Sequence, residues 1–157
     1  MQPNELGKKY DRIARWWHER HDSSDYGVPQ FERALNYANG PQKVLDVGCG
    51  AGGRLVRLLD GHKADYTGID VSIEMIELAR FNHPRHRFIH GDICSWQAAD
   101  QYDLIFAWDS IFHLPLSMQE SVVVKLCQLL TTDGLLMYSF GNAEGCLLYT
   151  SPSPRDS

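Results

Sequence analysis

The sequence predicts an α/β protein in which helices cover both faces of a parallel, doubly wound sheet, and two patterns indicate this fold class. Short runs of β-branched and aromatic residues alternate along the chain with segments of helical periodicity. After the first such run, Gly48, Gly50, Gly52 and Gly53 connect a strand to a helix. Glycines at this junction adopt backbone angles that other residues avoid, and they let a ligand approach the N–H groups of the helix.

The expected elements follow from these patterns in chain order. Apolar residues at helical spacing predict two helices before the first strand, at 5–20 and 29–38. Apolar runs predict five strands, at 43–47, 65–69, 87–90, 103–107 and 135–140. The segments between them predict helices at 53–59, 73–82 and 118–130.

The boundary between the last helix and the last strand carries specific signals. Ser117 and Glu120 match a capping box, which predicts the start of the helix. The residues Thr-Thr-Asp-Gly at 131–134 are expected to turn the chain into the final strand. That strand is expected to lie at an edge of the sheet, with unpaired backbone groups and uncovered apolar side chains at 135–138.

Composition indicates a single domain and disfavours several kinds of partner. The 157 residues are 43% hydrophobic, with a net charge of −5 and no cluster of Lys and Arg, so a nucleic acid is not expected to bind. No apolar run is long enough to span a membrane, and the N-terminus does not resemble a secretory signal. The four cysteines show no CxxC spacing, which favours free thiols and a cytoplasmic protein.

The glycine-rich junction leaves two cofactor classes to compare. Gly48, Gly50 and Gly53 with Asp70 match the spacing of a dinucleotide-binding fingerprint, which favours NAD. Asp46, at the end of the preceding strand, would place negative charge near a pyrophosphate. S-adenosylmethionine carries a sulfonium and an ammonium and has no phosphate, so the acidic strand end favours that cofactor.

Four segments resemble the motifs of class I S-adenosylmethionine-dependent methyltransferases, in the order of that family. They are Val-Leu-Asp-Val-Gly-Cys-Gly-Ala-Gly at 44–52, Tyr-Thr-Gly-Ile-Asp-Val-Ser at 66–72, Phe-Ile-His-Gly-Asp-Ile at 88–93 and Tyr-Asp-Leu-Ile-Phe-Ala-Trp at 102–108. The resemblance covers about residues 40 to 141. It implies a Rossmann-like sheet with five strands in the order 3-2-1-4-5. The family's antiparallel hairpin of strands six and seven is missing from this chain.

The resemblance also implies roles for individual residues. Asp70 would bind the ribose hydroxyls and Asp92 the adenine amino group, while Asp46 and the glycines would surround the methionine moiety. The whole implied cofactor-binding set is Tyr10, Asp46, Gly48, Cys49, Gly50, Gly52, Asp70, Val71, Met75, Asp92, Ile93, Ala107 and Trp108.

The domain organisation has three expected parts. Residues 1–40 form an N-terminal helical cap, in which Tyr10, Trp16 and Trp17 either contact the ligand or only pack. Residues 41–141 form the cofactor-binding core and complete a methyltransferase domain of residues 1–141. The segment 142–157 ends in low-complexity sequence and is expected to be a non-native or disordered tail of a truncated protein.

Few side chains are candidates for chemistry beyond cofactor binding. His113 follows the fourth expected strand and is either a general base or a packing residue. Cys49 is either a nucleophile activated by the helix N-terminus or a small packing residue. Asp109 is either a ligand for a cationic acceptor or a metal, or an ordinary loop carboxylate. The histidine pairs lack a third ligand of fixed spacing, so no metal site is expected.

The sequence therefore predicts an enzyme that transfers a methyl group from S-adenosylmethionine to a small-molecule acceptor by direct in-line displacement. Two alternatives stay open. One is an NAD-dependent oxidoreductase with a Rossmann fold, and the other is a cofactor-binding fragment without turnover.

Overall fold

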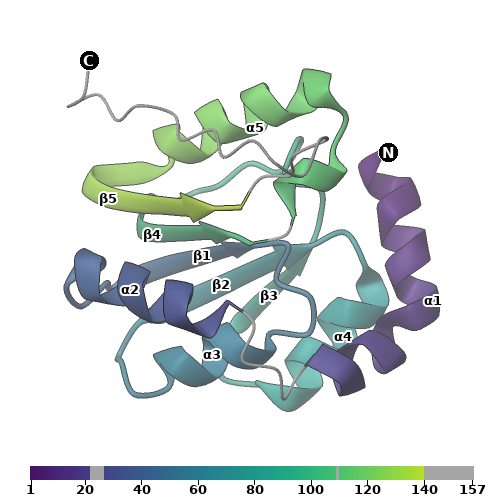
Figure 1. The fold of residues 1–157 in the computed structure, drawn as a ribbon, viewed down its shortest axis with the longest axis horizontal. Coiled ribbons are helices and arrows are strands. Elements are labelled where there is room, and N and C mark those ends of the chain that lie inside the picture. The colour runs from purple at the N-terminus through teal and green to yellow at the C-terminus, as the bar shows by residue number, and fades with distance from the viewer. Residues whose placement is uncertain (22–26, 109, 140–157) are drawn as a thin grey trace.

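The computed structural model describes residues 1–21, 27–108 and 110–139, and these form one five-stranded sheet (Figure 1). The strands are β1 (Lys43–Val47), β2 (Asp65–Asp70), β3 (Arg87–His90), β4 (Tyr102–Ala107) and β5 (Leu130–Tyr138). They lie in the order β3-β2-β1-β4-β5, and all four neighbouring pairs are parallel. The predicted fold class and strand order are confirmed.

Helices cover both faces of this sheet (Figure 1). They are α1 (Pro3–His21), α2 (Val28–Ala38), α3 (Gly53–Leu59), α4 (Ile73–Asn82) and α5 (Leu116–Gln128), with a short 3-10 helix at Ile111–His113. Neighbouring residues of each strand point to opposite faces. Val44 and Leu104 pack in one apolar cluster with α2, α3 and α4, while Leu45 and Ile105 pack in another with α5.

Helix α1 lies outside these two layers, beside the carboxyl ends of the strands (Figure 1). Ala14 on α1 is buried in a third small cluster with Ala51 and Met75. Tyr10 and Trp17 pack against the same cluster from α1. Helix α1 therefore covers the edge of the sheet at which the glycine-rich junction lies.

Two predicted boundaries near the C-terminal end are wrong. Helix α5 starts at Leu116, with Pro115 as its N-cap, so Ser117 lies inside the helix and caps nothing. The Pro115 carbonyl accepts the first helical hydrogen bonds, from the backbone N–H of Met118 at 2.8 Å and of Gln119 at 3.2 Å. Pro115 has a fixed φ angle and an extended ψ angle, so it is the last residue before the helix. The helix therefore begins at Leu116, ahead of the predicted cap at Ser117.

The segment 131–134 is a bulge within β5 and not a turn before it. Leu130 pairs with Tyr102 and Leu135 with Leu104, so β5 has more residues than β4 over this stretch. The strand ends at Tyr138, and the predicted end at Phe140 lies outside the described residues. Within the described part of the chain, β5 is an edge strand, as predicted. Its apolar side chains at 135–138 are half-buried and pack against the two core clusters, so the expectation that they are uncovered is wrong.

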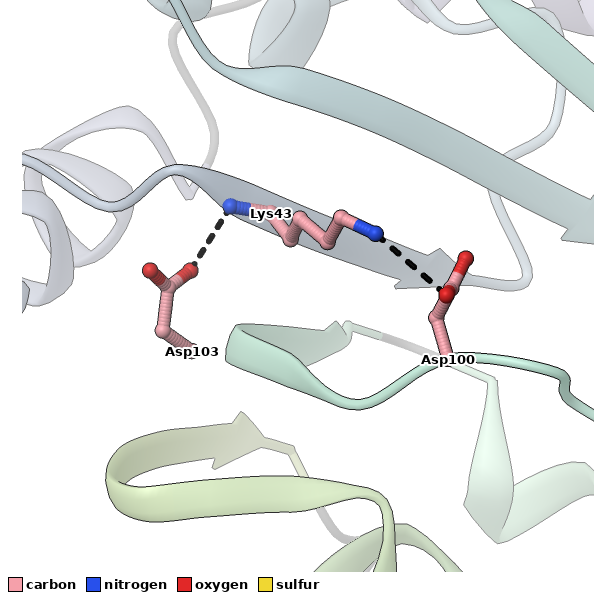
Figure 2. A network of polar contacts seen from close by, with 3 residues as sticks. All are labelled: Lys43, Asp100 and Asp103. Atoms are coloured by element: carbon pink, nitrogen blue, oxygen red, sulfur yellow. Dashed lines mark hydrogen bonds and ion pairs between the residues drawn. The ribbon is translucent and has the colours of Figure 1, made fainter.

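Polar contacts close the opposite end of the sheet, where the strands begin (Figure 2). The Asp103 carboxylate accepts hydrogen bonds from the backbone N–H of Gln42 at 2.8 Å and of Lys43 at 2.9 Å. The Lys43 ammonium lies 3.4 Å from the Asp100 carboxylate. Asp103 therefore ties the start of β1 to β4.

Candidate functional site

A cavity of about 270 Å³ lies at the carboxyl ends of β1, β2 and β4, under α1. Open α/β sheets bind ligands at this edge. Eleven of the thirteen residues implied as cofactor-binding line it, namely Tyr10, Gly48, Cys49, Gly50, Gly52, Asp70, Val71, Met75, Asp92, Ile93 and Trp108.

Bare backbone forms the floor of the cavity between β1 and α3. Gly48, Gly50, Gly52 and Gly53 all have positive φ angles, from 41° to 91°, which side chains strongly disfavour. A Cβ on Gly48 would lie 2.4 Å from the Cβ of Ser110, so the strand end and the segment after β4 approach closely only because position 48 is glycine. This floor matches the expectation for a ligand that contacts the main chain.

Asp70 ends β2 and fixes the shape of this floor. Its two carboxylate oxygens accept hydrogen bonds from the backbone N–H of Gly50 and of Ser72, each at 2.9 Å. Burial raises the pKa of Asp70, and those N–H groups oppose the rise. Asp70 lines the cavity while it holds the glycine loop to the start of α4.

Asp92 follows β3 and is the second carboxylate of the cavity wall. Its Oδ1 accepts a hydrogen bond from the Cys94 backbone N–H at 2.9 Å, and its carbonyl accepts one from Trp96 at 2.8 Å. These bonds form a turn that presents Asp92 and the buried Ile93 to the cavity.

Asp46 and Ala107 are the two implied residues that do not line the cavity. Asp46 is buried beneath the glycine loop and accepts a 2.6 Å hydrogen bond from the Tyr66 hydroxyl. Burial raises the pKa of Asp46 to about 7, although the Tyr66 bond acts in the opposite direction. Ala107 is fully buried within β4. A direct contact between either side chain and a ligand in this cavity does not fit the geometry.

The structure favours the packing interpretation of Cys49. Its Sγ would lie 2.8 Å from a Cβ placed on Gly68, so the thiol fills space over a glycine of β2. Burial raises the pKa of Cys49 well above its ordinary value, and the nearby Asp70 and Asp46 add to this effect. A thiol that resists ionisation is a poor nucleophile.

Aromatic side chains close the cavity on the side of α1. Tyr10 packs edge-to-face on Trp17, with ring centroids 5.6 Å apart, and lies 6.3 Å from the His113 ring. All three rings line the cavity. Trp16 does not line it, because its half-exposed ring stacks under the Arg20 guanidinium at 5.0 Å.

Several lining residues were not predicted: Pro3, Leu6, His18, Arg54, Ser110, Ile111 and Leu114. Leu6 shares the helical face of Tyr10 and Trp17, so its spacing was a usable signal. Ser110 has no such signal. Its Oγ is buried and has no hydrogen-bond partner in the described part of the chain. A polar atom of a ligand would supply that partner.

The described residues hold neither a metal-binding cluster nor a membrane-spanning helix. No group of three or more His, Cys, Asp or Glu residues in 1–21, 27–108 and 110–139 is arranged to hold a metal ion. No helix in these ranges has the length and apolar character needed to cross a membrane. Asp109 and the tail at 142–157 lie outside the described residues.

Comparison with known proteins identifies the family. A methyltransferase domain model matches residues 44–134. The ubiquinone biosynthesis O-methyltransferase of Vibrio vulnificus is 30% identical over 145 residues, which cover 85% of this chain and 60% of that enzyme. The chain therefore spans less than two thirds of the length of the curated relatives it matches.

Solved structures agree with this match. The complex of DhpI with SAM and HEP is 25% identical, with a TM-score of 0.70 over 86% of this chain and 63% of that one. The sugar N-methyltransferase KedS8 from Streptoalloteichus is 19% identical and shows the same fold, with a TM-score of 0.71 over 87% of this chain and 56% of that one.

The family match contains the glycine loop, Asp70 and Asp92, which are the residues that shape the cavity. Together with the strand order, this match shows that the chain belongs to the methyltransferase domain family, in its class I, S-adenosylmethionine-dependent group.

Proposed function

We propose that this chain binds S-adenosylmethionine in the cavity and transfers its methyl group to a small-molecule acceptor. The observation that carries the proposal is the placement of two carboxylates, Asp70 at the end of β2 and Asp92 just after β3, around a glycine floor. The buried Ser110 hydroxyl adjacent to Gly48 also fits a ligand with polar groups at this floor.

Each wall of the cavity would hold a different part of the cofactor. Asp70 would accept hydrogen bonds from the ribose hydroxyls, in addition to those it accepts from Gly50 and Ser72. Asp92 would accept one from the adenine amino group, while Ile93 packs on the purine. The loop at Gly48 and Gly50 would lie along the methionine moiety.

The bound cofactor would supply a methyl group on a sulfonium. A nucleophile of the acceptor would form a bond to the methyl carbon in line, while the bond from that carbon to sulfur breaks and the sulfur leaves as a neutral thioether. The protein mainly has to hold the two partners in a reactive geometry, which is worth about 7–11 kcal/mol of barrier. Tyr10 and Trp17 would exclude water from this space. His113, at the same wall, would remove a proton where the acceptor is weakly acidic.

The carboxylate that disfavours a dinucleotide in this cavity is Asp92 and not Asp46. Asp46 is buried away from the cavity, so its charge does not face a ligand there. Asp92 replaces it as the distinguishing feature, because a dinucleotide enzyme has no general need for a carboxylate after the third strand. The acceptor is proposed as a small molecule because the similar enzymes above act in ubiquinone biosynthesis and on a sugar.

Calorimetric titration tests the cofactor assignment. S-adenosylhomocysteine should bind and NADH should not. Binding of NADH alone would replace the proposal with the oxidoreductase alternative.

Turnover of methyl-labelled S-adenosylmethionine against a panel of small phenols, amines and carboxylic acids tests the reaction. Product should form with at least one class. Binding without turnover across the panel would instead identify the chain as a cofactor-binding fragment.

A further inference from the structure

We propose that Asp11 is a positioning residue that fastens α1 over the cavity and thereby controls retention of the cofactor. Asp11 lies on α1 and accepts two hydrogen bonds on the same carboxylate oxygen, Oδ1. One comes from the Ser72 hydroxyl at 2.6 Å and the other from the Glu74 backbone N–H at 3.2 Å. Both donors belong to the first turn of α4 or its cap, where a negative charge is also favoured by the helix dipole.

Ser72 connects Asp11 to the ligand site. It is completely buried, and its hydroxyl caps α4 by accepting from the Met75 backbone N–H at 3.2 Å while it donates to Asp11. Its own backbone N–H donates to Asp70 at 2.9 Å. One residue therefore contacts both the carboxylate of the cavity wall and the carboxylate of the covering helix.

A second and independent contact shows that α1 is seated closely on the same segment. A Cβ on Gly7 would lie 2.4 Å from the Val71 carbonyl oxygen and 3.0 Å from its carbon. Backbone atoms cannot move aside as a flexible side chain can, so only glycine allows this approach. Further along α1, the ring Nε2 of His18 lies 3.3 Å from the Asn82 amide nitrogen of α4.

The position of α1 determines one wall of the cavity. Leu6, Tyr10 and Trp17 line it from α1, on both sides of Asp11 in the sequence. An α1 that leaves α4 removes all three side chains from the cavity at once. Most of the stability of a helix in a protein comes from packing of its apolar face, so undocking should also loosen the hydrogen bonds of α1.

This inference rests on the proposed function only where it concerns cofactor retention. Two measurements separate docking of α1 from retention of the cofactor. Hydrogen exchange of the α1 amides in the ligand-free protein reports docking. Calorimetric titration with S-adenosylhomocysteine reports retention. Asp11→Ala should accelerate exchange throughout α1 and weaken binding about tenfold, in line with the loss of a hydrogen bond to a charged group.

Two further variants test the mechanism. Asp11→Asn keeps an acceptor oxygen at the same place, so it should retain most of the docking and affinity. Gly7→Ala puts a methyl group against Val71, so it should undock α1 and reproduce the effect of Asp11→Ala. It should do so even though alanine has a higher helix propensity than glycine. Gly61→Ala, where the new methyl group meets open space, is the matched control and should behave as the parent protein.

The outcomes are distinct. Unchanged α1 exchange in Asp11→Ala overturns the proposal, and so does an equal loss in Asp11→Asn and Asp11→Ala. Faster exchange with unchanged affinity overturns the part on cofactor retention. If the parent protein binds no S-adenosylhomocysteine, the proposed function fails, while the exchange data still decide whether Asp11 fastens α1.

Discussion

At the amino ends of the strands, Asp103 uses both carboxylate oxygens to bind the backbone N–H groups of Gln42 and Lys43, and it does not line the cavity (Figure 2 shows the Lys43 contact). At the carboxyl ends, Asp70 makes the same kind of paired contact with Gly50 and Ser72, but one side of it faces a cavity. The two residues share a local chemistry and differ in what surrounds them.

The difference teaches that a carboxylate bonded to backbone N–H groups is not by itself a sign of function. Asp103 does not line the cavity, whereas Asp70 and the glycines of the loop do. The same carboxylate contact therefore stabilises one end of the sheet and prepares the other for a ligand. Substitutions at the two ends should separate stability from binding.

Asp70→Ala should have the largest effect, mainly on binding, and it also removes the acceptor of the Gly50 and Ser72 backbone N–H groups. Loss of two charge-assisted hydrogen bonds to the ribose, each worth about 1.5–3 kcal/mol, should weaken S-adenosylhomocysteine binding by more than about 100-fold. Calorimetric titration measures this change, with Asp103→Ala as the control at the other end of the sheet. An unchanged dissociation constant in a variant that still unfolds cooperatively would remove Asp70 from the ligand site.

Asp46→Asn should change how stability depends on pH. The pKa of Asp46 is about 7 in the folded protein and near 3.8 when unfolded, so the folded state holds the proton more tightly. The contribution of this group to the free energy of unfolding is fully present below pH 3.8 and is lost as the pH rises from 3.8 through about 7. Urea unfolding measures the free energy of unfolding at pH 5 and at pH 8. The decrease between the two pH values should be smaller in Asp46→Asn than in the parent protein by about 2–3 kcal/mol, since one pKa unit corresponds to roughly 1.36 kcal/mol. Equal losses in both proteins would show that Asp46 is ionised in the fold.

Asp92 should discriminate between ligands that differ at one group. S-inosylhomocysteine, which has a carbonyl in place of the adenine amine, should bind the parent protein about 1–3 kcal/mol more weakly, since the carboxylate then faces an acceptor. Asp92→Asn offers a donor and should recover part of this loss. Equal affinity of the parent for both ligands would count against the adenine role and favour the dinucleotide alternative.

Asp103→Ala should have the smallest effect, and the effect should be on stability alone. The backbone N–H groups of Gln42 and Lys43 lose their acceptor. Gln42 is exposed, so water can accept its hydrogen bond in place of Asp103, and the free energy of unfolding should fall by only about 1–2 kcal/mol. Asp100→Ala removes only the exposed partner of Lys43 and should change it by less than about 0.5 kcal/mol. A weaker affinity for S-adenosylhomocysteine in Asp103→Ala would show that the two ends of the sheet are coupled.

The sequence was sufficient for those features that local pattern determines. The bounds of β1 and β3, the helix after the glycine loop and the positions of Asp70 and Asp92 follow from periodicity and from the ordered motifs. The start of α5 did not follow, because two signals overlapped and Pro115 prevailed over Ser117. The bulge at 131–134 arises from pairing with β4, which a local pattern does not contain.

The candidate site was predicted less completely, because side-chain direction depends on distant neighbours. Asp46 stands in the expected motif, yet the Tyr66 hydroxyl on β2 binds it away from the cavity. Ser110 reaches the cavity because Gly48 has no side chain to exclude it. The contact of Asp11 with Ser72 joins residues 61 positions apart, and nothing in either local sequence indicates it.

The close contact between Gly7 and the backbone of Val71 affects how the chain folds during translation. Helix α1 is made first, but the residues on which it docks follow about 60 positions later, which is roughly 3–12 s at ordinary rates of translation. Throughout this interval Leu6, Tyr10 and Trp17 have no partner surface to cover them. A nascent chain stalled before residue 71 should therefore expose this apolar face to chaperones, whereas one stalled after α4 has emerged should hide it.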